Sequence, residues 1–107
     1  MKTLVIGAST KSERYSNIAI HGLRSHIQEV ITLAKREGEV SDVKIQTNFP
    51  LNEDINTVTM YVGEKHQVEY YKPLLELKPE RVIFNPGAEN FELAEKILSL
   101  RLTLNSL

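Results

Sequence analysis

KTLVIGASTKSERYS, residues 2–16, is the stretch from which the architecture of this chain can be inferred. It begins with a short apolar run that stops at Gly7, and a loop of small hydroxylated residues follows. Apolar residues at intervals of three and four then predict an amphipathic helix over residues 14–26, with Ser12 or Ser16 as its N-cap. A strand, a small-residue turn and a helix in this order are how α/β proteins present backbone N–H groups to a phosphate.

The composition is that of a globular protein with one core. The 107 residues are 41% hydrophobic and 25% charged, and the net charge of −1 gives no overall basic field that would favour nucleic acid or a membrane surface. The absence of cysteine excludes disulfides, thiolate metal sites and cysteine nucleophiles. No stretch approaches the roughly 20 apolar residues of a membrane span, and the first apolar run is too short for a signal peptide. We therefore expect a cytoplasmic protein with one domain over residues 1–107 and no nucleic-acid or membrane partner.

Further strands are predicted over residues 29–34, 43–46, 56–62 and 81–84, each rich in apolar or β-branched side chains. The strand at 43–46 alternates apolar and polar residues, as a short edge strand does. Only residues 35–42 separate it from the preceding strand, fewer than the roughly dozen that a parallel crossover with its own helix requires. This strand is therefore either reached by an irregular crossover or runs antiparallel at the edge.

Two more helices are predicted, over residues 64–77 and 89–98. Pro73 lies inside the first of them, so that helix is expected to kink there or to consist of two pieces. Residues 101–107 are interpreted as one more strand. The series of strands and helices predicts a doubly wound α/β fold with a mostly parallel sheet.

Ligands of such sheets bind beyond the carboxyl ends of the strands, where the strand order reverses. In a 3-2-1-4-5 order this crevice lies between the first strand and the strand that ends at Tyr61 and Val62. The segments expected there are residues 7–11, 34–36, 61–64 and 85–87, with Arg14 and Ser16 facing the same place.

Two features of the crevice separate classes of nucleotide. The turn after the first strand has one glycine and lacks the G-x-G-x-x-G pattern of dinucleotide-binding proteins, and a lone Gly7 is equally compatible with an ordinary left-handed turn. The second strand is followed by Lys35 and Arg36, where an NAD site has an acidic residue. These bases suit a ribose that carries a phosphate, as in NADP or coenzyme A; the alternative is a solvated basic loop.

Catalytic side chains are few. His21, His26 and His66 are spread over helices without a carboxylate at triad spacing, and no metal-binding pattern occurs. We expect no catalytic residue and no metal ligand, and hence a binding module rather than an enzyme.

Three motifs resemble the CoA_binding_2 (YccU-like) family: VIGAS at 5–9 with RYS at 14–16, DINTVTMYV at 54–62, and LKPERVIFNPGAEN at 77–90. The resemblance implies a Rossmann-like, doubly wound fold related to the CoA-binding domain of the succinyl-CoA synthetase alpha subunit, with a mostly parallel sheet of five or six strands and helices on both faces. It also implies a non-catalytic protein whose cofactor is coenzyme A or an acyl-CoA. The ligand phosphates would lie on the 7–11 turn and the following helix N-terminus. The residues expected to bind the cofactor are Gly7, Ala8, Ser9, Thr10, Lys11, Arg14, Tyr15, Ser16, Ala34, Lys35, Tyr61, Val62, Gly63, Asn85, Pro86 and Gly87.

The chain departs from the family pattern at two places. Members usually have a glycine between the first helix and the second strand, where this chain has Ile27, so we expect a different turn. Members of the family also continue further past the final helix and have a Cys-Thr-Leu segment there. In this chain the corresponding residues, 100–104, come earlier and contain no cysteine. A homodimer or a partner enzyme is left open. The alternatives are an NADP-binding domain of oxidoreductase type and an interaction domain whose nucleotide site has decayed.

Overall fold

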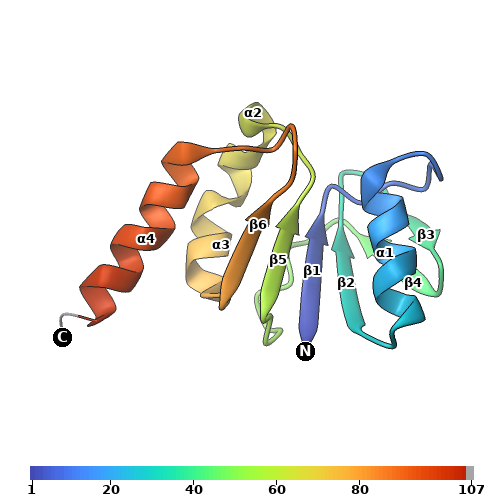
Figure 1. The fold of residues 1–107 in the computed structure, drawn as a ribbon, viewed down its shortest axis with the longest axis horizontal. Helices are drawn as coiled ribbons and strands as arrows, with labels where there is room; N and C mark the ends of the chain where they lie inside the picture. The colour runs from blue at the N-terminus through green and yellow to red at the C-terminus, as the bar shows by residue number, and fades with distance from the viewer. Residues whose placement is uncertain (106–107) are drawn as a thin grey trace.

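The computed structural model describes residues 1–105 and contains one six-stranded sheet (Figure 1). Its strand order is β3-β4-β2-β1-β5-β6, in which β4, β2, β1, β5 and β6 are parallel and β3 is antiparallel to β4. The strands are β1 (Lys2–Ile6), β2 (Glu29–Leu33), β3 (Gly38–Val40), β4 (Val43–Gln46), β5 (Thr57–Met60) and β6 (Arg81–Phe84).

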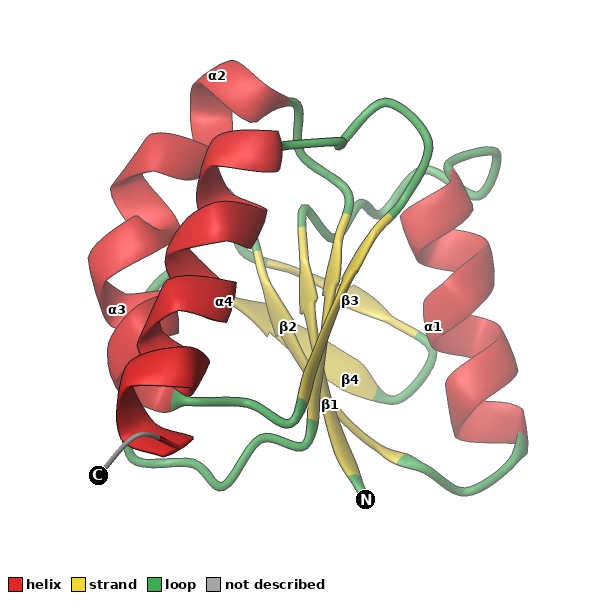
Figure 2. Cartoon of the chain, turned by 60° about the vertical axis from the view of Figure 1, so that its left-hand side comes forward, coloured by secondary structure: helices red, strands yellow, loops and turns green. Residues whose placement is uncertain are grey.

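Helices cover both faces of the sheet, as Figure 2 shows. The helix α1 (Tyr15–Ser25) lies on one face, and α3 (Tyr71–Leu77) and α4 (Phe91–Asn105) lie on the other. A short helix α2 (Glu64–Gln67) and a 3₁₀ turn η1 (Val68–Tyr70) precede α3. The predicted doubly wound, Rossmann-like fold is confirmed. Among the described residues, no helix is long and apolar enough to cross a membrane.

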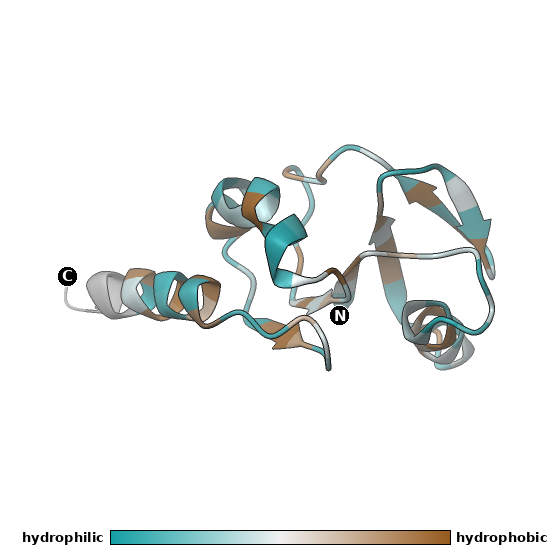
Figure 3. Ribbon diagram, turned by 90° about the horizontal axis from the view of Figure 1, so that it is seen from above, coloured by the Kyte–Doolittle hydropathy of each residue, from teal (hydrophilic) through white to brown (hydrophobic). Residues whose placement is uncertain are grey.

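The position of β1 inside the sheet explains why its sequence is continuously apolar. Leu4 and Ile6 point to the face that α3 and α4 cover, whereas Val5 packs against Ile20 of α1 on the other face. All four side chains are completely buried. A strand with helices on both faces needs apolar residues at successive positions rather than in alternation. Figure 3 shows the resulting concentration of hydrophobic residues along the strands.

The link between β2 and β4 contains a strand that the sequence analysis missed. Residues 38–40 form β3, which pairs with β4 in an antiparallel hairpin, with Val40 opposite Val43. The strand β4 itself runs parallel to β2, so the irregular crossover is the correct alternative. The prediction that residues 43–46 form the sheet edge was wrong, because β3 occupies that edge.

Both C-terminal helical predictions need correction. The 64–77 segment is divided at residues 68–70 and not at Pro73. Pro73 lies in the first turn of α3, where its missing N–H would have had no intrahelical acceptor, so the helix tolerates it. The predicted strand at 101–107 is wrong through residue 105, since α4 continues to Asn105; residues 106 and 107 lie outside the described residues.

The turn after α1 keeps the geometry of a glycine stop without a glycine. Ile27 has φ 58°, its N–H donates to the Arg24 carbonyl oxygen at 2.9 Å, and the Gln28 N–H donates to the Leu23 carbonyl oxygen at 3.1 Å. This pair of hydrogen bonds defines a Schellman motif. The expectation of a different turn was therefore wrong. Arg24 also contacts Asp42 through two hydrogen bonds of 2.8 and 2.7 Å and donates to the Gln28 carbonyl oxygen, which ties the end of α1 to the β3–β4 turn.

Candidate functional site

The loops after β1 and β5 meet at Gly7. Its φ is +94°, and a Cβ atom at this position would lie 2.9 Å from Val62 Cγ1 and 3.1 Å from the Tyr61 carbonyl carbon. The Tyr61 N–H donates to the Ile6 carbonyl oxygen at 2.9 Å, which extends the pairing of the two strands into these loops. Only glycine meets both the positive φ and the close approach. The predicted crevice between these two strands therefore begins at a direct loop-to-loop contact.

The first two amides of the turn are not directed at a ligand. The N–H groups of Gly7 and Ala8 both donate to the Leu33 carbonyl oxygen, at 2.9 and 3.2 Å. The Lys11 N–H donates to Ser9 Oγ at 3.1 Å. The amides of residues 7 and 8 thus fasten the loop to β2, and the phosphate site expected on the 7–11 turn stays a prediction.

The loop is held against α1 by Asn17, a residue that the sequence analysis missed. Its side chain is 5% exposed, and its Nδ2 donates to the Ser9 carbonyl oxygen at 2.8 Å. The N-terminus of α1 has Arg14 as its N-cap in an extended conformation, and no side chain of the described residues caps it. The predicted capping by Ser12 or Ser16 was wrong. The first-turn N–H groups of α1, which have no intrahelical acceptor, therefore lack a side-chain cap among the described residues.

A cavity of about 320 Å³ opens beside this loop. One wall is residues 8–11, and the other is residues 34–37 after β2 together with Ile45 of β4. Thr10 also lies against the β3–β4 hairpin, because its Cγ2 is only 2.7 Å from where a Cβ atom on Gly38 would be. The loops contribute three cations to the lining: Lys11, Lys35 and Arg36.

A second cavity of about 340 Å³ joins the first at Ala8, Ala34 and Lys35, which line both. It lies between the loops after β1, β2 and β5 and the α2–η1 segment. Its remaining lining residues are Gly7, Val62, His66, Glu69 and Tyr70. The last three of these were not predicted as site residues. The hydrophobic spacing of residues 64–77 marks positions that face the core, and it gives no signal for the side chains that border a cavity.

Lys35 contacts two residues across the second cavity. Its Nζ forms an ion pair with Glu69, and the same atom lies 6.0 Å from the centroid of the Tyr70 ring. The hydrogen bond to Glu69 raises the pKa of Lys35, and burial raises the pKa of the Tyr70 hydroxyl. The predicted basic residue after β2 is therefore already paired in the structure.

The Asn85–Gly87 segment has the predicted turn but lines neither cavity. The Ala88 N–H donates to the Asn85 carbonyl oxygen at 2.8 Å, and Gly87 has φ +90°, as the third position of a type II turn requires. Asn85 Nδ2 donates to Thr59 Oγ1 at 2.7 Å and to the Met60 carbonyl oxygen at 2.9 Å. These bonds give Asn85 a role in joining the ends of β5 and β6.

A buried pair of amides supports the wall formed by Val62. Gln67 is completely buried, and its Nε2 donates to the carbonyl oxygens of Val62 at 2.9 Å and Ala88 at 2.7 Å. Its Oε1 accepts from Asn90 Nδ2 at 3.0 Å, while Asn90 Oδ1 caps α4 by accepting from the Leu93 N–H. Neither amide was predicted from the sequence, because polar residues within helical patterns are usually exposed.

The structure thus brings together about half of the predicted binding residues. Eight of them line the two joined cavities: Gly7, Ala8, Ser9, Thr10, Lys11, Ala34, Lys35 and Val62. Tyr61 packs against the apolar cluster beneath them. Seven line neither cavity: Arg14, Tyr15, Ser16, Gly63, Asn85, Pro86 and Gly87.

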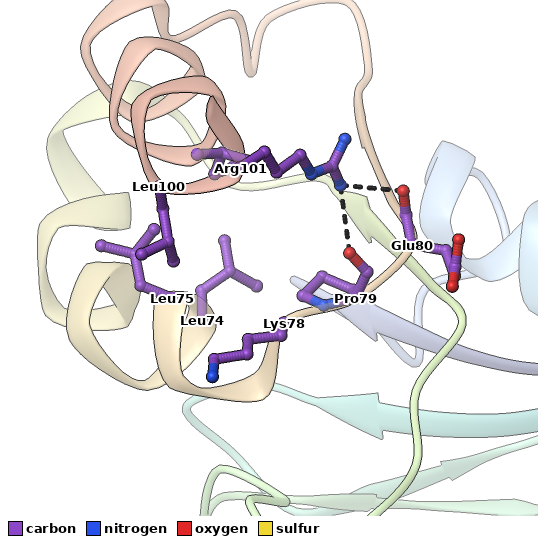
Figure 4. Close-up of a pocket in the computed structure, with 8 residues that line it drawn as sticks. Leu74, Leu75, Lys78, Pro79, Glu80, Leu100 and Arg101 are labelled. Atoms are coloured by element: carbon purple, nitrogen blue, oxygen red, sulfur yellow. Dashed lines mark hydrogen bonds between the residues drawn. The ribbon is translucent and has the colours of Figure 1, made fainter. Parts of the chain in front are cut away.

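A separate hollow of about 350 Å³ lies at the amino end of β6, between α3 and α4 (Figure 4). Aliphatic side chains line it together with Lys78 and Glu80, and Arg101 donates there to the carbonyl oxygens of Pro79 at 3.0 Å and Glu80 at 2.8 Å. None of the predicted site residues lines it. Within residues 1–105, no group of three or more histidine or acidic side chains is placed to hold a metal ion.

Comparison with known proteins gives a family and several structural relatives. The family model described as "CoA binding domain", CoA_binding_2, matches residues 1–105, which confirms the resemblance in the sequence. The crystal structure of an uncharacterised protein is 41% identical, with a TM-score of 0.88, over 92% of this chain and 82% of that one. A hypothetical protein from Pyrococcus horikoshii OT3 is 26% identical, with a TM-score of 0.80, over 92% of this chain and 70% of that one. No curated protein matches the chain.

Proposed function

Because the chain belongs to the CoA_binding_2 family of CoA binding domains, we propose that it binds coenzyme A or an acyl-CoA in the two joined cavities. The observation that carries the proposal is their junction at Ala8, Ala34 and Lys35, beyond the carboxyl ends of β1 and β2. Parallel sheets of this class bind nucleotides at this edge. Two connected cavities suit a ligand with a polar nucleotide half and a less polar pantetheine half.

The nucleotide half fits the first cavity. In the proposed arrangement the adenosine lies toward Ala34 and the diphosphate lies near Lys11. The diphosphate extends beyond the cavity toward the uncapped N-terminus of α1, which does not line it. Lys35 and Arg36 are near enough to the same cavity to receive a phosphate on the ribose. The pantetheine then follows the second cavity past Val62, whose position the buried amide of Gln67 maintains.

We propose binding without catalysis. The second cavity contains His66, Glu69 and Tyr70, but Glu69 is paired with Lys35, and the ring of Tyr70 lies among the core residues. A carrier or sensor of CoA, acting alone or with a partner enzyme, requires only the binding geometry. We also propose a cytoplasmic location, because coenzyme A is a water-soluble ligand.

Isothermal titration calorimetry with CoA, dephospho-CoA and NADPH tests this function. We expect saturable binding of CoA, weaker binding of dephospho-CoA and no binding of NADPH. The variant Ala34→Leu, which places a larger side chain at the junction, should lose CoA binding, while Ala94→Leu on the distant helix α4 should retain it. Preference for NADPH would favour an oxidoreductase-type domain. If none of the three ligands binds at millimolar concentration, the protein is better explained as an interaction domain.

A further inference from the structure

We propose that Glu69 pairs with the ammonium group of Lys35 when no ligand is bound, and that the ribose phosphate of the ligand displaces Glu69 from this pair. This inference rests on the proposed function and adds a residue that sets the affinity and selectivity of that site. It concerns the ion pair between Lys35 of the loop after β2 and Glu69 of η1, two residues that line the second cavity.

The pair between Lys35 and Glu69 is weak enough for another anion to replace Glu69. The side chains of Lys35 and Glu69 are 69% and 47% exposed, so water screens their attraction. Ala8 and Ala34 are the other two residues that line both cavities, and their side chains are small. A dianionic phosphate offers Lys35 more charge and more acceptor oxygens than one carboxylate does.

Lys35 is the one cation among the described residues that lines both cavities. Without an acidic partner, this ammonium group would attract small anions to the junction. Glu69 neutralises it in the free protein, and the centroid of the Tyr70 ring lies 6.0 Å from Nζ. A ligand that lacks the ribose phosphate brings no dianionic group to Lys35, whereas the ribose phosphate of CoA takes the place of Glu69.

The exchange has a measurable consequence. Glu69→Gln removes the competing charge and should tighten CoA binding by about two- to fivefold, which is the range that an exposed ion pair is worth. It should leave the affinity for dephospho-CoA unchanged. The gain must also depend on Lys35: in a Lys35→Gln background, the change at residue 69 should have no effect on CoA.

The test is a calorimetric cycle of wild type, Glu69→Gln, Lys35→Gln and the double variant, each titrated with CoA and dephospho-CoA. Glu76→Gln, on α3 and away from both cavities, is the control with the same change of charge, and it should bind as wild type does.

Three results would overturn the inference. Equal CoA affinity of wild type and Glu69→Gln would show that Glu69 does not compete. A gain that persists without Lys35, or that extends to dephospho-CoA, would show general repulsion of anions rather than exchange. In each of these cases wild type still binds CoA and the proposed function stands; absence of CoA binding by wild type and all variants would refute the function itself.

Discussion

Gly7 and Val62 touch: a Cβ atom on residue 7 would lie 2.9 Å from Val62 Cγ1. This contact joins the loops after β1 and β5 and fixes one end of the second cavity. The substitution Gly7→Ala is therefore expected to lower the free energy of unfolding by roughly 2–4 kcal/mol, from the cost of a positive φ together with overpacking. Urea denaturation measures the change.

Gly22 provides the control for this prediction. It lies within α1, and a Cβ atom there would meet no atom within 4 Å. Gly22→Ala should therefore stabilise the protein by about 0.5–1 kcal/mol, because alanine favours the helix. Equal effects of the two substitutions would contradict the close approach of Gly7 to Val62.

Ile27 should be replaceable with a gain in stability. It is β-branched, has φ 58° and is 86% exposed, so it carries backbone strain and buries little surface. We expect Ile27→Gly to raise the free energy of unfolding by about 1 kcal/mol. Ile27→Ala should give no comparable gain, since alanine is also strained at a positive φ. A thermal melt of the three proteins distinguishes the outcomes.

Gln67 should be intolerant of an apolar replacement of similar size. Gln67→Leu leaves the carbonyl oxygens of Val62 and Ala88 without the donor that they have now, and Asn90 loses one of its two acceptors and keeps the Tyr71 hydroxyl. The expected loss is about 2–4 kcal/mol of stability. The exposed Gln46→Leu is the comparison and should change stability little. A tolerated Gln67→Leu would show that this network does not support the Val62 wall.

The ion pair between Arg24 and Asp42 predicts a pH dependence. The hydrogen bond from Arg24 lowers the pKa of Asp42 to about 2, below its value of roughly 4 in an unfolded chain. A lowered folded-state pKa contributes stability above the unfolded pKa and loses it as the pH falls toward 2. Wild type should therefore exceed Asp42→Asn in stability at pH 6, and the difference should shrink below pH 4. A constant difference down to pH 3 would contradict the assignment.

The fold was predictable because its main signals are local in the sequence. The apolar run before Gly7 and the β-branched run before Tyr61 mark buried parallel strands, and glycine and proline mark their ends. The strand at residues 38–40 was missed because three residues, one of them glycine, give too little periodicity to be recognised. The helical continuation to Asn105 was missed because a leucine-rich run satisfies both strand and helix patterns.

The candidate site was predictable only in part. Residues directly after β1, β2 and β5 reach the cavities because the carboxyl ends of parallel strands share one edge. Glu69 and Tyr70 reach the same place through the bend at residues 68–70, which spacing alone does not specify. The N–H groups of Gly7 and Ala8 donate to the Leu33 carbonyl oxygen, and these two tertiary hydrogen bonds likewise have no signal in the sequence.

Backbone amide NMR of the labelled protein, titrated with CoA, tests the central claim most directly. The account predicts saturable shifts at Ser9, Thr10, Lys11, Ala34, Lys35 and Val62, which line the two joined cavities. The amides around the hollow between α3 and α4 should stay unchanged. Shifts confined to residues 74–80 and 97–101, or no shifts at millimolar CoA, would contradict it.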